Sequence, residues 1–248
     1  MKVGFLITAR LKSTRLPMKI ILKINRIEII RHMINRIKES KVINEIIICT
    51  SANPQDKPLV EIANKEGIKY FLGDEEDVIQ RLSDAAQHFK LDYVINVTAD
   101  NPLVSLEYIT KIYKKFKKTN ADHIRCNDLP IGLYSYGLKP EALLKVCEIK
   151  KTKQTEIWGS YFTETGLFDV RNLKIPKKYQ RDYRLTLDYP EDFDFFEKIF
   201  HHFGEETYKV SLNNLIKFLD KNPDVVAINI NCQKLYEKRR EKQKRLAI

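Results

Sequence analysis

The sequence predicts an α/β protein with a mostly parallel sheet and helices on both of its faces. Strand and helix patterns alternate four times within the first 118 of the 248 residues. The expected strands are apolar on both sides, as residues 2–8 show, which is typical of strands buried inside a parallel sheet. Alternation of this kind implies right-handed βαβ crossovers. The length suits one domain of this class.

Each expected element of the N-terminal half rests on its own pattern. Isoleucines recur at helical spacing from residue 27 to 41 with basic residues between them, which predicts an amphipathic helix. Prolines at 54 and 58 begin a second helix, and Gly67 ends it. The expected strands cover residues 2–8, 44–51, 68–72 and 93–98, and the expected helices cover residues 27–41, 54–66, 75–89 and 106–118.

The C-terminal half is less regular. Residues 126–173 follow no clean period, so we expect them to form a small irregular segment that pairs two copies of the chain. A strand at residues 184–187 and a helix at 191–202 follow. No linker or repeat divides the chain, which predicts a single domain over residues 1–248. Residues 233–248 form a basic tail, for which a solvated or frayed helix is favoured over an anion-binding role.

The composition narrows the class of partner. Lysine and arginine exceed aspartate and glutamate by 44 − 33 = 11, which suits an anionic ligand. No apolar run approaches the ~18 residues that cross a bilayer. The apolar stretch at the N-terminus is too short for the core of a signal peptide, so we expect a cytoplasmic protein. Four cysteines lie far apart without a CxxC pair, which favours reduced thiols over a zinc site or disulfides.

The first functional signal is the loop TARLKSTRLPMK at residues 8–19, directly after the first strand. Ligands of open α/β sheets bind at the carboxyl ends of the strands. Guanidinium groups offer forked donors to phosphate oxygens, and an ammonium group adds a compact charge. The loop therefore predicts a phosphate site rather than an ordinary solvated turn. It matches neither GxxxxGK[ST] nor GxGxxG, which argues against a P-loop ATPase and a dinucleotide-binding dehydrogenase.

Two acidic corners follow later in the chain. VTADNP places Asp100 after the fourth strand, and RLTLDYPED places Asp188 after the strand expected at residues 184–187. Taken alone, Asp100 is as consistent with a turn or a helix cap. Two carboxylates opposite a cationic loop are nevertheless what a magnesium nucleotide needs, because Mg²⁺ takes few carboxylates beside phosphate oxygens and water. Asp192 is expected to cap the following helix.

Two further segments carry candidate residues. In FLGDEEDVIQR, Asp77 and Arg81 lie four residues apart on one helix, so they either pair with each other or leave Arg81 to reach a nucleotide. In TEIWG, Glu156 is a candidate substrate contact. The single tryptophan, Trp158, belongs either to the core or to the wall of a substrate pocket.

These motifs together resemble those of the sugar cytidylyltransferases over roughly residues 3–200. The family patterns are (I/A)xARxxSxRLPGK, G(S/D)xxDVLxR, (T/G)D(C/N/E)P and R(W/L)T(V/L)D(T/Y)PED. The family includes enzymes that activate 3-deoxy-manno-octulosonate (KDO) and sialic acids, and the SpsF-type spore-coat proteins. The resemblance implies a Rossmann-like fold of the nucleotide-diphospho-sugar transferase type.

The resemblance also implies roles for individual residues. It assigns nucleotide binding to Ala9, Arg10, Ser13, Arg15, Lys19, Asp77 and Arg81, metal binding to Asp100 and Asp188, catalysis to Arg10, Lys19, Asp100 and Asp188, and acceptor binding to Glu156. The implied reaction transfers CMP from CTP to a sugar-like acceptor in polysaccharide precursor synthesis. It requires Mg²⁺ and releases pyrophosphate. Relatives use the segment matching 126–173 to form a homodimer and to complete the acceptor pocket.

Two departures from the family pattern matter. Met18 stands where the family has glycine, and a methionine there is strained if the position needs positive φ. TEIWG differs from the block that SpsF-type sequences carry, so a nonulosonic acid, KDO, a sugar phosphate and a small phosphonate-like acid all remain open as acceptors.

Two other functions compete with this interpretation. A glycosyltransferase that uses a nucleotide sugar usually carries an Asp-x-Asp motif, which Asp100-Asn101-Pro102 is not. A polyanion-binding or nucleic-acid-binding protein would suit the charge. However, the aromatic residues are not interleaved with the basic runs as stacking would require. We therefore expect neither a nucleic-acid nor a membrane partner.

Overall fold

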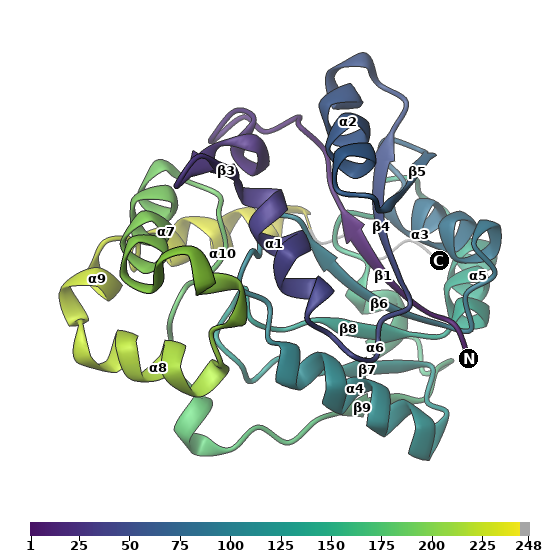
Figure 1. Cartoon of the computed structure of the whole chain (residues 1–248). Coiled ribbons are helices and arrows are strands. Elements are labelled where there is room, and N and C mark those ends of the chain that lie inside the picture. The colour runs from purple at the N-terminus through teal and green to yellow at the C-terminus, as the bar shows by residue number, and fades with distance from the viewer. Residues whose placement is uncertain (244–248) are drawn as a thin grey trace.

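A seven-stranded sheet of order β5-β4-β1-β6-β8-β7-β9 forms the centre of the computed structural model, which describes residues 1–243 (Figure 1). Its strands are β1 (Val3–Thr8), β4 (Glu45–Ser51), β5 (Lys69–Gly73), β6 (Tyr93–Thr98), β7 (His123–Arg125), β8 (Tyr136–Leu138) and β9 (Val170–Asn172). Neighbours among the first four of these strands pair in parallel, whereas β8 is antiparallel to both β6 and β7. The predicted mostly parallel sheet is confirmed.

Helices cover both faces of this sheet (Figure 1). They are α1 (Ile29–Lys38), α2 (Lys57–Lys65), α3 (Val78–His88), α4 (Leu106–Thr119), α5 (Pro140–Ile149), α6 (Gly159–Thr163), α7 (Pro190–Phe203), α8 (Leu212–Lys221), α9 (Pro223–Ala227) and α10 (Cys232–Gln243). None of these described helices is long and apolar enough to span a bilayer.

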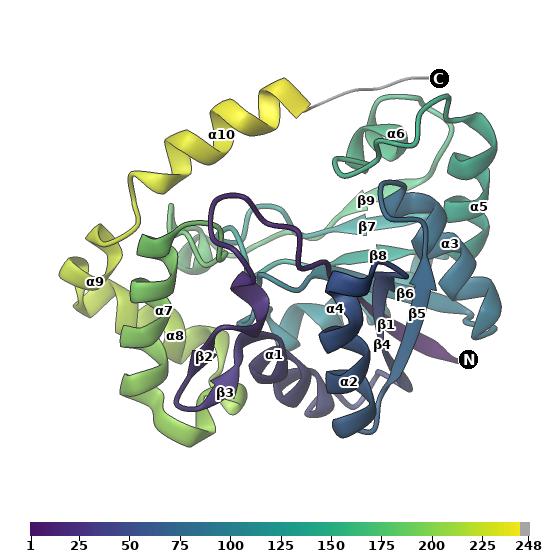
Figure 2. The same ribbon diagram turned by 90° about the horizontal axis from the view of Figure 1, so that it is seen from above.

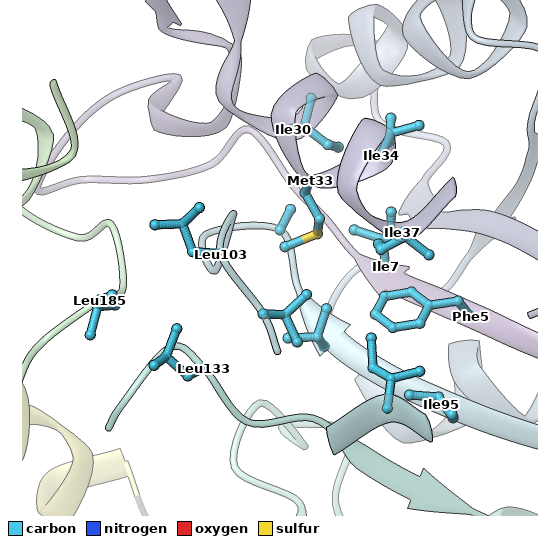
Figure 3. Packing of buried hydrophobic residues seen from close by; sticks show 14 of the residues in the cluster. Phe5, Ile7, Ile30, Met33, Ile34, Ile37, Ile95, Leu103, Leu133 and Leu185 are labelled. Atoms are coloured by element: carbon cyan, nitrogen blue, oxygen red, sulfur yellow. The ribbon is translucent and has the colours of Figure 1, made fainter. Parts of the chain in front are cut away.

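The core divides into two apolar clusters, because alternate side chains of a strand point to opposite faces. Phe5 and Ile7 of β1 belong to the larger cluster, which Figure 3 shows with α1 residues such as Ile34 packed above them. Leu6 belongs to the second cluster with Leu82 of α3. All five side chains are fully buried. The doubly apolar pattern of residues 2–8 thus reflects a strand covered on both sides.

The predicted helix over residues 27–41 is shorter than expected. Residues 23–28 instead form a small hairpin of β2 (Lys23–Ile24) and β3 (Ile27–Glu28). Asn25 and Arg26 both have positive φ, of 50° and 65°, which is the conformation that a two-residue turn of type I′ requires. The helix therefore begins only at Ile29.

Residues 126–173 are more regular than expected, although more than half of them lie outside helices and strands. This stretch contains β8, α5, α6 and β9, and it extends the sheet beyond β6. Its aromatic residues Trp158, Tyr161 and Phe162 are at most 7% exposed and pack in the second cluster of the same chain. The period escaped the sequence analysis because the strands have only three residues each. Among its large apolar side chains, Leu144 and Leu167 remain exposed.

The strand expected at residues 184–187 is also wrong in extent. Only Arg184 forms a β-bridge, with Ile131. The chain continues extended, and Leu187 N donates to the carbonyl oxygen of Asp100 at 2.8 Å. A side chain at Gly132 would meet Leu185 O at 1.9 Å, so this close approach requires glycine. This backbone hydrogen bond between Leu187 and Asp100 places the two acidic corners next to each other.

The chain ends in α10, so the terminal helix expected within residues 233–248 is confirmed as far as Gln243. Residues 244–248 lie outside the described part of the chain. Figure 2 shows α10 extending from α9 past α7 toward α6. The helix is not a purely solvated tail, since Tyr236 and Arg239 line the cavity described next.

Candidate functional site

A cavity of about 460 Å³ lies at the carboxyl ends of β1 and β6, where ligands of open α/β sheets bind. Five loop residues that the sequence assigned to the nucleotide line it: Ala9, Arg10, Ser13, Arg15 and Lys19. Asp100 and Asp188 line the same cavity. The structure therefore brings the cationic loop and both acidic corners together, as the sequence predicts.

The loop is anchored by a residue that the sequence analysis missed. Asp56 is fully buried and accepts hydrogen bonds from Leu11 N at 2.8 Å and from Ser51 Oγ at 2.6 Å. On the other side, Arg10 Nη1 donates to Glu75 O at 2.6 Å. A buried carboxylate inside a helix-opening turn gives no sequence signal that distinguishes it from an ordinary cap.

Met18, which stands where the family pattern has glycine, adopts a conformation that favours glycine. Its φ of 56° and ψ of 20° lie in the left-handed region, where a side chain is unfavourable. Lys19 follows directly and begins a short 3-10 helix at residues 19–21. The turn that directs Lys19 toward the acidic corners is thus kept, at the cost of backbone strain at Met18.

The ammonium group of Lys19 lies between the two acidic corners. Lys19 Nζ donates to Asp100 Oδ2 at 2.6 Å and to Asp188 Oδ1 at 2.9 Å. The carbonyl oxygen of Leu187 accepts a third bond at 2.7 Å. Burial alone would lower the pKa of Lys19, but the two carboxylates more than reverse this and raise it. Lys19 is therefore a cation at neutral pH.

Asp188 is nearly buried and is held by three cations. Besides Lys19, Arg15 Nη2 bonds its Oδ1, and Arg184 Nη2 donates to its Oδ2 at 3.0 Å. Burial would raise the pKa of Asp188, yet these cations hold it well below its usual range. A buried carboxylate is tolerated when it is paired and hydrogen-bonded in this way. Asp188 is consequently ionised throughout the physiological pH range.

A second carboxylate fixes Arg184 behind Asp188. Arg184 Nε and Nη2 donate to the two oxygens of Asp192 at 2.8 and 3.0 Å, and both residues are almost completely buried. Asp192 also accepts from the backbone N–H groups of Asp188 and Tyr189, which confirms the predicted cap of α7. The role of Arg184 was missed, although its spacing of four and eight residues from the two aspartates was a readable signal.

Asp100 is oriented by the turn after β6. Thr98 Oγ1 donates to Asp100 Oδ1 at 2.5 Å, and Asn101 Nδ2 donates to Thr98 Oγ1 at 2.7 Å. The other oxygen, Oδ2, faces Lys19. The turn after β6 therefore holds Asp100 in the direction that the site requires.

Asp77 and Arg81 do not pair with each other. Asp77 caps α3 through Gln80 N at 3.1 Å, accepts from Thr155 Oγ1 at 2.9 Å and forms an ion pair with Lys150. It is not among the residues that line the cavity, so the structure gives it a structural position, unlike the role the resemblance implied. Arg81 does line the cavity and is fully buried.

Arg81 has hydrogen-bonding capacity left over. Its Nη1 donates to the carbonyl oxygens of Asp74 and Glu75, whereas its Nε and Nη2 have no hydrogen-bond partner among the described residues. Burial lowers the pKa of Arg81. Buried polar atoms are rarely left unpaired. These two donors are therefore exceptions, buried without a partner among the described residues.

The far wall of the cavity is aromatic and acidic. Glu156, the candidate substrate contact, lines the cavity together with Trp158 and Tyr136, whose rings meet edge to face at 5.2 Å. Trp158 packs in the core and also lines the cavity, so it occupies both of the positions that the sequence left open for it.

The donor set fits a magnesium ion. Within residues 1–243 no group of three or more His, Cys, Asp or Glu side chains forms a complete metal cage. Asp100 and Asp188 nevertheless approach a common cation position, since both contact the same ammonium group. Mg²⁺ prefers such partial sites, where phosphate oxygens and water complete the shell.

The chain is similar in sequence and in fold to known proteins. Residues 5–230 match the family model described as cytidylyltransferase. The chain is 35% identical to the uncharacterized protein MJ1063 of Methanocaldococcus jannaschii, over 95% of this chain and 98% of that protein. It is 27% identical to the spore coat polysaccharide biosynthesis protein SpsF of Bacillus subtilis, over 89% and 95%. A solved cytidylyltransferase from Leptospira borgpetersenii superposes with a TM-score of 0.84 at 27% identity, over 91% and 97%.

The family match spans the cationic loop and both acidic corners, and the solved relative shares the sheet on which they lie. The chain therefore belongs to the cytidylyltransferase family, and it is a nucleotidyltransferase.

Proposed function

We propose that the protein transfers CMP from CTP to a small sugar-like acceptor with release of pyrophosphate, and that the reaction depends on Mg²⁺. The observation that carries this proposal is a single cluster at the carboxyl ends of β1 and β6, which Lys19, Asp100 and Asp188 form. It combines a phosphate-binding cation with two carboxylates that share one cation position. The relation to SpsF supports a role in supplying polysaccharide precursors.

The chain's own residues divide the work as follows. Arg10, Ser13, Arg15 and Lys19 bind the triphosphate, because they line one wall of the cavity and supply charged donors. Arg81 lines the same cavity and adds a further guanidinium group beside the nucleotide. Preorganised cations of this kind stabilise the charge that develops as pyrophosphate leaves.

Asp100 and Asp188 would hold the metal ion, which when bound supplies the positive charge that polarises the α-phosphate. Arg184 helps to keep Asp188 ionised, and Asp192 holds the Arg184 side chain and the Asp188 backbone in place. Glu156 and the neighbouring aromatic wall lie where an acceptor can approach the α-phosphate. The acceptor oxygen forms a bond to the α-phosphorus, and the bond from that phosphorus to the bridging oxygen of pyrophosphate breaks.

We further propose that two copies of the chain associate through residues 126–173. Leu144 and Leu167 supply exposed apolar side chains there in place of the buried aromatic residues. Light scattering at micromolar concentration tests this pairing. A mass near twice 29.2 kDa supports it, and a mass near 29.2 kDa contradicts it.

Pyrophosphate release from ATP, CTP, GTP and UTP tests the function. Each nucleotide is incubated with a panel that contains KDO, a sialic acid, a sugar phosphate and an aminoalkyl phosphonate, with Mg²⁺ or with EDTA. We expect release that requires CTP, one class of acceptor and Mg²⁺. Equal release from UTP, or undiminished release in EDTA, contradicts the proposal.

A further inference from the structure

Asp77 belongs to one of the family motifs but does not line the nucleotide cavity, although its neighbours Glu76 and Val78 both do. Its side chain is only 3% exposed, and it bonds with two residues more than seventy positions away, Lys150 and Thr155. A carboxylate buried so deeply costs free energy unless it is paired and hydrogen-bonded, as it is here. Asp77 therefore joins the start of α3 to the segment that follows α5.

The hydroxyl group of Thr155 lies at the centre of this contact. Thr155 is fully buried, and its Oγ1 donates to Asp77 Oδ1 at 2.9 Å and accepts from Ile79 N at 3.0 Å. Asp77 Oδ1 also accepts from Gln80 N at 3.1 Å, and its Oδ2 forms the ion pair with Lys150. Buried polar networks whose members are all satisfied make the structure around them rigid. This buried network therefore holds the first turn of α3 firmly against the chain at residue 155.

The buried network anchors the segment that carries Glu156. Residues 151–154 are exposed or partly exposed, and Thr155 is the first buried residue after them. Glu156 follows directly, and it lines the nucleotide cavity together with Ile157 and Trp158. Trp158 is held further along by its packing in the second apolar cluster. The position of Glu156 is thus set by the bonds of Thr155 on one side and by the packing of Trp158 on the other.

The anchored segment also borders a second cavity, of about 510 Å³, which adjoins the first. Tyr136, Ile157 and Gly159 line both cavities. Each volume falls within the range of roughly 300–1,000 Å³ typical of small-molecule sites. Arg81, one turn further along α3 than the buried network, lines the first cavity as well. The network therefore ties two parts of the nucleotide cavity together, namely the start of α3 and the segment beside the second cavity.

We propose that Asp77 and Thr155 are positioning residues, which fix Glu156 and Trp158 at the distance from the nucleotide that transfer to the acceptor requires. This inference rests on the proposed function and adds two residues to its acceptor side. Neither residue lines a cavity, so both act through the segment that carries Glu156. Without the Thr155 hydroxyl group, Asp77 still caps α3 through Gln80 N. Loss of this hydroxyl group should therefore impair use of the acceptor more than binding of CTP.

The single tryptophan of the chain reports the position of this segment without any substrate. Trp158 is 7% exposed, so acrylamide should quench its fluorescence only weakly in the wild-type protein. In Thr155→Val the quenching constant should rise by about twofold or more, because the segment loses its anchor. Thr155→Ser keeps the hydroxyl group and should behave as the wild type.

Thr207→Val serves as the matched control in the full-length protein. Thr207 is also buried, and its Oγ1 donates to Gly204 O at 2.6 Å, but it lines neither cavity. The variant loses one hydrogen bond of a buried threonine and should leave the quenching of Trp158 unchanged. An equal rise in Thr207→Val and Thr155→Val would show a general loosening and would overturn the inference.

Steady-state kinetics separate positioning from a general loss of stability. The assay contains CTP, Mg²⁺ and whichever of KDO, a sialic acid, a sugar phosphate or an aminoalkyl phosphonate supports pyrophosphate release. Thr155→Val should lower kcat/KM for that acceptor roughly 10–100-fold, because a misplacement of about 1 Å can cost this much. The KM for CTP should stay within about twofold, and Thr155→Ser should restore use of the acceptor.

Wild-type use of the acceptor by Thr155→Val overturns the inference, as does an equal loss for the acceptor and for CTP or an unchanged quenching of Trp158. If Thr155→Val does not fold, Lys150→Met removes the ion pair and keeps the hydroxyl bond, so a smaller change in the same direction is expected. No change in that variant would also overturn the inference. If the wild-type protein uses no acceptor, the proposed function fails, whereas the quenching comparison still decides whether the network holds the segment.

Discussion

The two cavities differ in how they are built. The nucleotide cavity is made largely from three short motifs, namely the loop after β1, the turn after β6 and the extended segment before α7. The second cavity is made from β7, α6 and α10, whose contributing residues lie far apart in the sequence. In this chain, the residues that match the family motifs lie within short stretches of sequence, whereas the second cavity forms only where distant segments of the chain meet.

The largest expected effect is on turnover, from a substitution that alters only the nucleotide cavity. Asp188→Asn removes one of the two carboxylates that share a cation position, so turnover should fall roughly 10²–10³-fold or more, as for loss of an electrostatic group in an active site. Steady-state pyrophosphate release measures it. Asp182→Asn, at an exposed position nearby, should retain full activity. Wild-type turnover in a folded Asp188→Asn variant would remove Asp188 from the site.

The next effect distinguishes nucleotide binding from acceptor binding. Arg10→Ala and Lys19→Ala should each weaken CTP binding roughly 10–100-fold, because a hydrogen bond to a charged group contributes about 1.5–3 kcal/mol. Acceptor affinity should stay within twofold. Calorimetric titration of each ligand gives both values, with Lys111→Ala on the exposed side of α4 as the control. A parallel loss of both affinities would indicate that the loop has collapsed.

A pH effect probes the wall of the second cavity. Burial among aromatic rings lowers the pKa of His123 to about 4, and its Nδ1 lies 3.1 Å from Gly137 O. The unfolded chain takes up this proton near pH 6.5, whereas the folded protein does so only near pH 4. The stability from this residue is therefore complete above pH 6.5 and is lost as the pH falls toward 4.

The expected loss is roughly 2–3 kcal/mol, at about 1.4 kcal/mol for each unit of pKa difference. Urea unfolding at pH 7 and pH 4.5 measures it. His123→Asn keeps an N–H donor without a titrating ring, so it should flatten the profile. His88→Asn, at an exposed position, should leave the profile unchanged. The same steep decline in His123→Asn would assign the effect to other groups, such as His32, whose pKa burial also lowers.

The smallest effect concerns strain in the nucleotide loop. Met18 has a φ of 56°, so Met18→Gly relieves a strain of about 1–2 kcal/mol and loses up to about 1 kcal/mol through the greater freedom of the unfolded chain. We expect a gain of about 0.5 kcal/mol in the free energy of unfolding over Met18→Ala, which keeps the strain. Denaturant titration of both variants gives the difference. A glycine variant that is less stable than the alanine variant would mean that the turn is not strained.

Much of the nucleotide cavity could be predicted because its residues lie next to strand ends. Lys19 belongs to the loop after β1, Asp100 to the turn after β6 and Asp188 to the end of an apolar extended segment, and the topology of the sheet brings these three together. Asp77 shows the limit of this reasoning. Its motif matched the family, but its direction is fixed by Lys150 and Thr155, which are more than seventy positions away.

The second cavity could not be predicted for the same reason. The strands β7 to β9 have three residues each, too few for a readable alternation, and they pair across long connections. The weakly patterned α10 resembled a solvated tail until its contacts with Arg184 were seen. Burial of Trp158 and Tyr161 likewise depends on where α6 packs, which residue types alone do not specify.

The fate of the phosphate groups tests the central claim most directly. CTP labelled at the α-phosphate, or separately at the γ-phosphate, is incubated with the protein, Mg²⁺ and the acceptor that supports pyrophosphate release. We expect the α label to appear in the acceptor product and all of the γ label to appear in pyrophosphate. Transfer of the γ label to the acceptor, or retention of the α label in free CMP or CDP, would contradict it.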